Sequence, residues 1–566
     1  MTSPLALLGG KPVVMQAAPH FTWPPVTDRT RTAVLDQLAA GVSIYDRSGV
    51  VERLETTLAD YHGARHAVLT NSSTAALHSM YAACRLGPED EVIVPAYTFF
   101  ATVTPLLHLG ARPVLADCDA NGNLDLHDVP RRITDRTAAV VVTHMWGVPA
   151  DVERLRAIAS EHDLMLFEDG SHAHGSTVKN RPVGTFGRAA AFSMNGPKPL
   201  SAGEGGFILT DDDEVYYRAL LHRQYNKRCR NEIPLDHPLY PYAVTGMGLK
   251  FRIHPLAAAI ALDQLDHLDE YLAGRETFAK YLCEQLGELP GIAVPRLGPD
   301  VRASWYGLIL QYQADELGGL PVERFHEALK AEGCHEVDRP GSTCPLNLLP
   351  LFQKPGPLFA DFGGELRYKR GDFPRAEALH HNTLKLPVWH KEEDMPLADN
   401  YIEAFRKVTA NYHDLLEHMV DTSLLERLSA EAEKDSVQQL VVGAVVQHDG
   451  KVLLLKRPDD DFMGGIFELP SGKVEPGEAL DVALIREVKE ETGLDVAGIR
   501  EYLGHFDYQS GSGKKSRQFN FAVDVSASEP VVLQEHDSYL WAELSEEPPV
   551  TDAVKDVLAR YRQLDG

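Results

Sequence analysis

The sequence lacks long apolar runs. None of its 566 residues belongs to an apolar stretch of the ~18 or more residues that a membrane-spanning helix needs. The opening segment, MTSPLALLGGKPV, also lacks a basic region followed by a long apolar core, which a secretion signal would have. We therefore expect a soluble, cytoplasmic protein that has no membrane as a partner.

Positive charge is also in short supply. The chain carries 55 Lys and Arg against 82 Asp and Glu, a formal net charge of −27. The mean field of such a protein repels polyanions, which argues against nucleic acid or an anionic membrane surface as a general partner. A substrate that carries phosphate must be attracted by local groups.

Cysteine is scarce, and its pattern excludes two classes of site. The six cysteines show neither a CxxC pair nor the spacing of a zinc site, which fits reduced thiols in a cytoplasm. Internal repeats, low-complexity tracts and a P-loop are missing as well. The composition, 44% hydrophobic and 24% charged, is ordinary for a globular protein, and the length allows three or more domains.

The segment Phe192–Gly206, FSMNGPKPLSAGEGG, contains groups that pyridoxal phosphate chemistry needs. That chemistry requires a lysine that holds the cofactor as a Schiff base, an acid that keeps its pyridine nitrogen protonated, and donors for its phosphate. We assign these roles to Lys198, to Asp169 at the end of the apolar run Leu164–Phe167, and to Ser193. Taken alone, a lysine near glycines is weak evidence, because most lysines lie on the surface.

Further motifs in the N-terminal part strengthen this interpretation. They are NSSTAAL at 71–77, VPAYTFFA at 94–101, THMWGVPAD at 143–151, NRPVG at 180–184 and GEGG at 203–206. Together they resemble the DegT/DnrJ/StrS family of sugar and cyclitol aminotransferases over roughly residues 1–415. The resemblance implies the aspartate-aminotransferase-like fold, fold type I, and glutamate or glutamine as the amino donor. Lys198 argues against the family's dehydratase relatives, in which histidine replaces it.

Four more residues gain a role from the resemblance. Ser73 and Thr74 precede an apolar-periodic segment, so they lie at a helix N-terminus, where free N–H groups favour a phosphate. The alternative is that they merely cap that helix. Phe99 matches the family's aromatic residue that stacks on the cofactor ring, with a core aromatic as the alternative, and His172 is expected to contact the cofactor as well.

Two positions depart from the commonest family pattern. Lys250 stands where many members have an asparagine that reaches the cofactor phosphate of the neighbouring subunit, so we expect a homodimer that shares its sites. A solvent-facing lysine is the alternative. Asn347 stands where histidine is frequent, and this change is expected to alter substrate choice. Both departures resemble members that act on keto-cyclitols or aminobenzoate precursors.

Short apolar runs alternate with longer amphipathic ones between residues 66 and 210. The pairs are 66–69 with 74–86, 92–94 with 99–109, and 138–142 with 151–159. Such alternation is typical of βα units around a mostly parallel sheet, and cofactors bind at the carboxyl ends of its strands. We predict an α/β protein with a large cofactor-binding domain at 1–256 and a small α/β domain at 257–418.

The C-terminal part carries a second signature, GKVEPGEALDVALIREVKEETGL at 472–494. On a helix, Glu487, Glu490 and Glu491 share one face, where like charges are destabilising unless a cation neutralises them. Carboxylates suit Mg²⁺, which completes its shell with water and phosphate oxygens. Arg486 is spaced to orient Glu490. The segment matches the Nudix pattern at every defining position; an ordinary solvated acidic face is the alternative.

The flanking sequence fits a Nudix α/β/α sandwich at 436–566. Strand-like apolar runs lie at 440–446, 452–455 and 519–525. The box helix is predicted to begin near Ala479, and Glu535 is a candidate further metal ligand or general base, with a surface carboxylate as the alternative. The acidic segment 415–436 has no Pro or Gly and is predicted to be helical, with a linker at 419–435.

These observations predict a two-part enzyme of amino-sugar or secondary-metabolite biosynthesis that uses pyridoxal 5′-phosphate and Mg²⁺. The first part is expected to move nitrogen from an amino acid to a keto-sugar or keto-cyclitol, with Lys198 as the base that shuttles the proton. The second is expected to hydrolyse a nucleoside diphosphate derivative, with Glu491 as a catalytic residue. The alternative is a Nudix part that only senses nucleotides, although a sensor would not need all of its glutamates.

Overall fold

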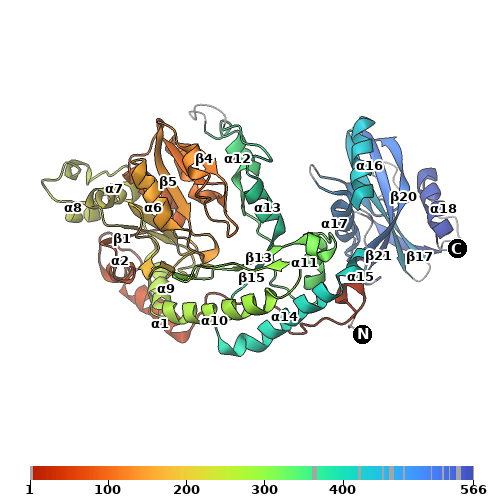
Figure 1. The fold of residues 1–566 in the computed structure, drawn as a ribbon, viewed down its shortest axis with the longest axis horizontal. Coiled ribbons are helices and arrows are strands. Elements are labelled where there is room, and N and C mark those ends of the chain that lie inside the picture. Colours follow the sequence, from red (N-terminus) through yellow and green to blue (C-terminus); the bar gives the residue numbers. More distant parts are fainter. Residues whose placement is uncertain are drawn as a thin grey trace. The chain divides into compact units, whose positions relative to one another are not determined.

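The computed structural model (Figure 1) describes residues 4–359, 366–417, 422–448, 451–457, 465–475, 478–510, 513–525, 528–533, 536–543 and 550–564. These residues form two compact units. The larger unit comprises Val13–Glu316 and Gly333–Arg406, and the smaller unit comprises Met1–Pro12, Leu317–Glu332 and Lys407–Gly566. None of the described helices is long and apolar enough to cross a membrane.

A seven-stranded sheet lies at the centre of the larger unit, in the order β1-β10-β9-β6-β5-β2-β4. Its strands are β1 (His66–Thr70), β2 (Glu91–Pro95), β4 (Arg112–Ala116), β5 (Thr137–Thr143), β6 (Met165–Asp169), β9 (Ala189–Ser193) and β10 (Gly206–Thr210). Neighbours from β9 to β4 are parallel, whereas β10 is antiparallel to both β9 and β1. Strands such as β9 are buried along their whole length, because helices cover both faces of the sheet. The predicted mostly parallel sheet is confirmed.

Helices alternate with these strands along the chain, as predicted. They are α1 (Asp28–Ala40), α2 (Gly49–His62), α3 (Ser73–Ala83), α4 (Thr104–His108), α5 (Val129–Arg132), α6 (Val152–Glu161), α7 (Asp213–Arg223), α8 (Lys227–Glu232) and α9 (Pro255–Leu265). The amphipathic run 99–109 is not one helix. Its start belongs to β3 (Tyr97–Phe99), which pairs with β14 (Thr343–Pro345), and only the short helix η2 (Phe100–Thr102) and α4 follow. This pairing brings residues that are distant in the sequence beside the carboxyl edge of the sheet.

The remainder of the larger unit contains a second, smaller sheet. Its order is β11-β13-β15, and all its pairs are antiparallel. The elements of this part are α10 (Leu268–Leu286), β11 (Ile292–Ala293), β13 (Leu308–Tyr312), α12 (Pro350–Gln353), α13 (Pro374–Asn382), β15 (Thr383–Leu386) and α14 (Met395–Ala410). A third small sheet joins β12 (Val301–Arg302), β7 (Thr177–Val178) and β8 (Arg181–Pro182).

The smaller unit is built on a seven-stranded sheet in which β18-β17-β16-β21-β20 are neighbours, β19 pairs with β16 and β22 with β17. The strands are β16 (Gln439–His448), β17 (Lys451–Lys456), β18 (Phe467–Glu468), β19 (Ser471–Lys473), β20 (Val496–Gln509), β21 (Lys515–Val525) and β22 (Ser538–Glu543). The helices are α11 (Val322–Ala331), α15 (Tyr412–Glu417), α16 (Thr422–Lys434), α17 (Leu480–Thr492) and α18 (Asp552–Leu564). Apolar residues of α16 and α17 pack on one face of the sheet and those of α18 on the other.

This arrangement is the predicted α/β/α sandwich. The strand-like runs at 440–446, 452–455 and 519–525 lie in β16, β17 and β21, and the box helix α17 starts directly after Ala479. Within segment 415–436, residues 415–417 belong to α15 and residues 422–434 to α16, and a turn follows at 435–436.

Candidate active sites

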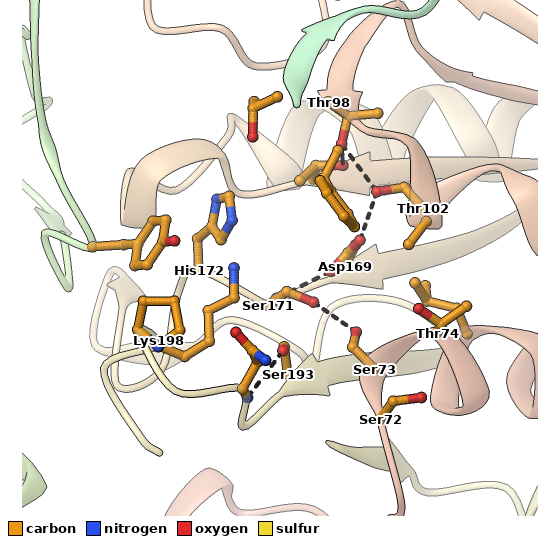
Figure 2. A pocket seen from close by; sticks show the side chains of 18 of the residues that line it. Ser72, Ser73, Thr74, Thr98, Thr102, Asp169, Ser171, His172, Ser193 and Lys198 are labelled. Carbon is orange, nitrogen blue, oxygen red and sulfur yellow. Dashed lines mark hydrogen bonds between the residues drawn. The ribbon is translucent and has the colours of Figure 1, made fainter. Parts of the chain in front are cut away.

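A cavity of about 310 Å³ opens at the carboxyl edge of the central sheet, as expected for a parallel sheet. Asp169 ends β6 and Ser193 ends β9, so both side chains reach this edge. The lining residues come from the start of α3, from the segments around the ends of β2, β5, β6 and β9, and from the stretches before β10, β13 and β14, and Figure 2 draws 18 of them. They are Ser72, Ser73, Thr74, Leu77, Thr98, Phe99, Ala101, Thr102, Thr143, Asp169, Ser171, His172, Ser193, Asn195, Pro197, Lys198, Glu204, Gly205, Tyr306, Ser342 and Thr343. Seven residues assigned from the sequence therefore share one cavity.

Asp169 is held in place by two donors. Its side chain is only 3% exposed. Oδ2 accepts a hydrogen bond of 2.8 Å from Thr102 Oγ1, and Oδ1 accepts one of 3.0 Å from the backbone N–H of Ser171. A carboxylate fixed in this way can present a lone pair to a protonated ring nitrogen without first reorganising.

Lys198 has the chemistry of a nucleophile. Burial lowers the pKa of its ammonium to about 7; the Asp169 carboxylate opposes this shift and the Lys385 ammonium adds to it. A neutral amine is therefore abundant at neutral pH, and only the neutral amine attacks a carbonyl carbon. Its Nζ lies 4.4 Å from the centre of the Tyr306 ring.

The opposite side of the cavity presents hydroxyl groups at the start of α3. The helix is capped by Ser72, whose Oγ accepts a hydrogen bond of 3.1 Å from Ala75 N–H. The alternative that Ser73 and Thr74 merely cap the helix is therefore wrong. Ser73 Oγ lies 2.8 Å from Ser171 Oγ, so a hydroxyl pair faces the same cavity as Ser193 (Figure 2).

Two flat side chains border the space between these groups. Phe99 is 37% exposed and lines the cavity, so the alternative of a core aromatic is wrong. His172 is buried and stacks on Tyr306, with ring centres 4.3 Å apart and planes 19° apart. Burial holds the pKa of His172 well below its ordinary value, which keeps the ring neutral. A neutral planar ring suits contact with an aromatic cofactor.

The donor set of this cavity fits pyridoxal 5′-phosphate. An oriented carboxylate, a neutral lysine amine, several hydroxyls beside a helix N-terminus and two flat side chains border one space, and these match the ring nitrogen, aldehyde, phosphate and ring faces of that cofactor.

Two assigned residues lie elsewhere. Lys250 is exposed and does not line the cavity within the single chain. Asn347 is fully buried, and its Nδ2 donates to the carbonyl of Lys369 (2.9 Å) and to Glu377 Oε1 (2.7 Å). The amide of Asn347 is thus committed to the packing beside α13 and does not face the cavity.

The sequence reasoning missed Thr102, Ser171 and Tyr306. Ser171 lies between Asp169 and His172, which are both assigned from the sequence, and its position was a usable signal. Tyr306 reaches the cavity from the second sheet region, and nothing in its local sequence marks it.

In the smaller unit, Arg486 of α17 binds three carboxylates in and just before this helix. Its guanidinium donates to Glu478 Oε1 (2.9 Å), Glu487 Oε1 (2.7 Å) and Glu490 Oε2 (3.0 Å). The predicted pairing of Arg486 with Glu490 therefore forms. Glu491 instead accepts a hydrogen bond of 2.8 Å from Ser471 N–H.

Burial changes the acidity of two of these groups. It raises the pKa of Glu491 to about 8, against the opposing effect of the Ser471 N–H, and it raises the pKa of Glu487. Gly472 explains the burial of Glu487, because a Cβ at this glycine would lie 1.9 Å from the glutamate's carboxyl group. The oxygen donors suit Mg²⁺ in kind.

The geometry around α17 is not yet that of a metal site. Within the described ranges, no three His, Cys, Asp or Glu side chains converge closely enough to hold a metal ion. Glu535 lies outside the described residues. Its neighbour His536 pairs through Nε2 with Glu468 Oε1 at 3.1 Å. Burial opposes the protonated form of this histidine, but the bond to Glu468, together with the charges of Glu491 and Glu468, outweighs burial and raises its pKa.

The sequence matches two families. The DegT/DnrJ/EryC1/StrS aminotransferase family matches residues 27–399, and the NUDIX domain matches residues 437–561. The spore coat polysaccharide biosynthesis protein SpsC of Bacillus subtilis is 35% identical over 361 residues, which cover 63% of this chain and 89% of that protein. The L-glutamine:scyllo-inosose aminotransferase of Streptomyces griseus is 34% identical over 427 residues, which cover 73% of this chain and 100% of that protein.

A solved structure shows the same fold. The aminotransferase from Psychrobacter cryohalolentis superposes with a TM-score of 0.62 at 26% identity, over 70% of this chain and 100% of its own. The predicted fold type I is thereby confirmed for the aminotransferase part.

Proposed function

The chain belongs to the DegT/DnrJ/EryC1/StrS aminotransferase family, and from this premise we propose that it transfers the amino group of glutamate or glutamine to a keto-sugar or keto-cyclitol. One observation carries the proposal: Asp169 and Lys198 line the same cavity, each with the chemistry that pyridoxal 5′-phosphate requires. When bound, that cofactor supplies an aldehyde carbon for attachment and a ring that withdraws electrons from the carbon that loses a proton.

Lys198 would hold the cofactor and move the proton. Because its pKa is about 7, Nζ can attack as a free amine and can later take up and return a proton at neutral pH. Asp169 would keep a proton on the ring nitrogen, in an orientation fixed by Thr102 and the Ser171 N–H.

The other lining residues would bind and orient. Ser73, Thr74 and Ser193 would donate hydroxyl hydrogen bonds to the phosphate, and the N-terminus of α3 would add N–H groups with a favourable dipole. Phe99 and His172 would border the ring faces and exclude water from them.

A cyclitol acceptor is supported by a relative and by the cavity. The Streptomyces griseus protein is named for L-glutamine and scyllo-inosose. The cavity, at about 310 Å³, has the size of a small-molecule site rather than of a long groove. Asn195, Ser342 and Thr343 add polar groups that can pair with ring hydroxyls.

We propose a homodimer in which Lys250 enters the neighbour's site. Tyr242, Val244 and Met247, shortly before it, are all about half exposed or more in the single chain, as expected for a surface that a partner covers. Mixing inactive Lys198→Ala with inactive Lys250→Glu should restore part of the activity, because one hybrid site has both good residues. Subunit exchange without restored activity would contradict shared sites.

We further propose that residues 437–561 form a Mg²⁺-dependent hydrolase of a nucleoside diphosphate derivative. In this proposal the chain has an aminotransferase part with domains at 1–256 and 257–418, a linker at 419–435, and a hydrolase domain at 436–566. Glu487, Glu490 and Glu491 would hold the cation, with Glu491 in a catalytic role, and Arg486 would give up part of its contacts to them. The cation would activate a water and orient the diphosphate.

A second candidate function is a nucleotide sensor that does not hydrolyse its ligand. The observation that favours it is the binding of Glu487 and Glu490 by Arg486, which leaves the described carboxylates without a metal-binding arrangement. Release of phosphate or nucleotide that depends on Mg²⁺ would decide for the hydrolase.

Half-transamination tests the main proposal. The protein loaded with pyridoxal 5′-phosphate should lose its visible absorbance when glutamine or glutamate is added and regain it when a keto-cyclitol follows. No change with any amino donor, while the cofactor stays bound, would contradict an aminotransferase.

A further inference from the structure

Lys198 is contacted at both ends by residues from distant parts of the chain. Its backbone carbonyl accepts a hydrogen bond of 2.7 Å from Trp23 Nε1, which lies before α1. Its Nζ lies 4.4 Å from the ring of Tyr306, which lies before β13. One aromatic residue therefore binds the backbone of the lysine, and another lies beside its amine.

Arg275 of α10 joins these two aromatic residues. Its Cζ lies 4.1 Å from the centre of the Trp23 ring, and its Nη1 donates to the carbonyl of Trp305, directly before Tyr306, at 3.1 Å. Trp305 has a φ of 52°, in the left-handed region that a bulky residue rarely adopts. A donor on its carbonyl therefore helps to hold the turn that aims Tyr306.

The position of Arg275 is energetically unfavourable by itself. The side chain is 1% exposed, its Nε lacks a hydrogen-bond partner, and no carboxylate among the described residues pairs with it. Burial lowers the pKa of Arg275 to about 10, so it remains charged at neutral pH. An apolar side chain would fill such a place at lower cost, so the buried charge calls for a role beyond packing.

The Trp23 ring is restrained from further sides. Tyr271 and His390 meet it edge-on, with ring centres 5.3 Å and 5.4 Å away. Neither Trp23 nor Arg275 is among the residues that line the cavity. Trp23 reaches the site through its bond to the Lys198 carbonyl, and Arg275 through its bond to the Trp305 carbonyl.

We propose that Trp23 and Arg275 form a bracket that positions Lys198: Trp23 fixes the backbone of the lysine, and Arg275 ties Trp23 to the turn that carries Tyr306. Both are positioning residues. The inference rests on the proposed function, in which Lys198 is the residue that holds the cofactor.

The substitution Trp23→Phe tests the bracket, because it keeps an aromatic ring and removes only the N–H donor. Trp389→Phe is a matched control. Trp389 lies in the larger unit and, like Trp23, donates its indole N–H to a backbone carbonyl, here that of His20 at 2.8 Å rather than that of Lys198. It is buried, whereas Trp23 is half-buried, so the control removes the more deeply buried donor of the two.

Trp23→Phe should attach pyridoxal 5′-phosphate to the cofactor-free protein about fivefold more slowly, as the loss of one hydrogen bond of ~1 kcal/mol implies. It should also weaken the visible circular dichroism of the bound cofactor, and lower kcat with little change in KM for the donor. Trp389→Phe should lower only the melting temperature. Equal attachment rates and equal spectra for the two variants would overturn the bracket.

Arg275 offers a second route if Trp23→Phe folds poorly. Arg275→Met removes the charge and the bond to Trp305, whereas Arg275→Lys keeps the charge and loses the planar stack on Trp23. Both should slow attachment, Arg275→Met more. An unchanged dichroism band in both would also overturn the bracket. If Lys198→Ala is inactive while the Trp23 and Arg275 variants behave normally, only the bracket is contradicted. If Lys198→Ala is active, the proposed function is contradicted as well.

Discussion

The two candidate sites differ in how far the fold alone assembles them. In the larger unit, Asp169 is oriented by two donors and burial brings the pKa of Lys198 to about 7. In the smaller unit, Glu487 and Glu490 are bound by Arg486, and Glu491 by the backbone of Ser471. A site built from the ends of several buried strands is fixed by packing, whereas the carboxylates along α17 would have to regroup before they could bind the proposed cation.

The largest effect is expected where the fold has fixed the chemistry. Lys198→Ala should lower half-transamination by orders of magnitude, because no other lining residue offers an amine to hold the cofactor. Hydrolysis of nucleoside diphosphate derivatives by the same protein should be unchanged. Absorbance with glutamine or glutamate measures the first activity, and released phosphate the second. A variant that keeps turning over would remove the assignment of Lys198.

The next prediction tests the proposed Mg²⁺ site on α17. Replacing Glu490 and Glu491 by Gln together keeps the shape of α17 and removes two of the carboxylates proposed to hold the cation, so hydrolysis should fall by several orders of magnitude, as loss of a metal's contribution implies. Transamination should stay near wild type. If wild type releases no phosphate or nucleotide with Mg²⁺, yet nucleotides change its transamination rate, the sensor is the correct function. If neither occurs, the contrast between the two sites has no functional basis.

Asp169→Asn probes the oriented carboxylate. The amide has one acceptor oxygen and can accept only one of the bonds from Thr102 and the Ser171 N–H, and it leaves the ring nitrogen without a carboxylate partner, so proton removal from the donor should slow by about a hundredfold. Cofactor affinity should fall as well. Single-turnover kinetics with glutamate, beside a cofactor titration, separate the two effects. A normal rate would move the pyridinium partner to another residue.

The smallest effect concerns the charge near Lys198. The Lys385 ammonium lowers the pKa of Lys198, so Lys385→Met should raise that pKa. Fewer molecules then carry a neutral amine at a given pH, and the pH profile of cofactor attachment should shift upward. Lys385→Arg, which keeps the charge, is the control. Identical profiles for the Met and Arg variants would show that burial alone sets the shift.

Many residues of both sites could be predicted from the sequence, because their positions follow from local patterns of apolar and charged residues. Asp169 and Ser193 each end an apolar run, and Glu487, Glu490 and Glu491 recur at helical spacing, so strand ends and a helix face predict their places. Tyr306 and Trp23 reach Lys198 from more than a hundred residues away, and no local period encodes such a contact. The hold of Arg486 on Glu487 also escaped prediction, because it depends on side-chain packing between β19 and α17.

The identity of the lysine that holds the cofactor is the central claim, and one measurement tests it directly. The loaded protein is reduced with borohydride, digested, and the pyridoxyl group is located by mass spectrometry. We expect it on the peptide that contains Lys198, and absent from that peptide in Lys198→Ala. A pyridoxyl group on Lys385 or Lys250, or on no peptide at all from a loaded protein, would contradict the account.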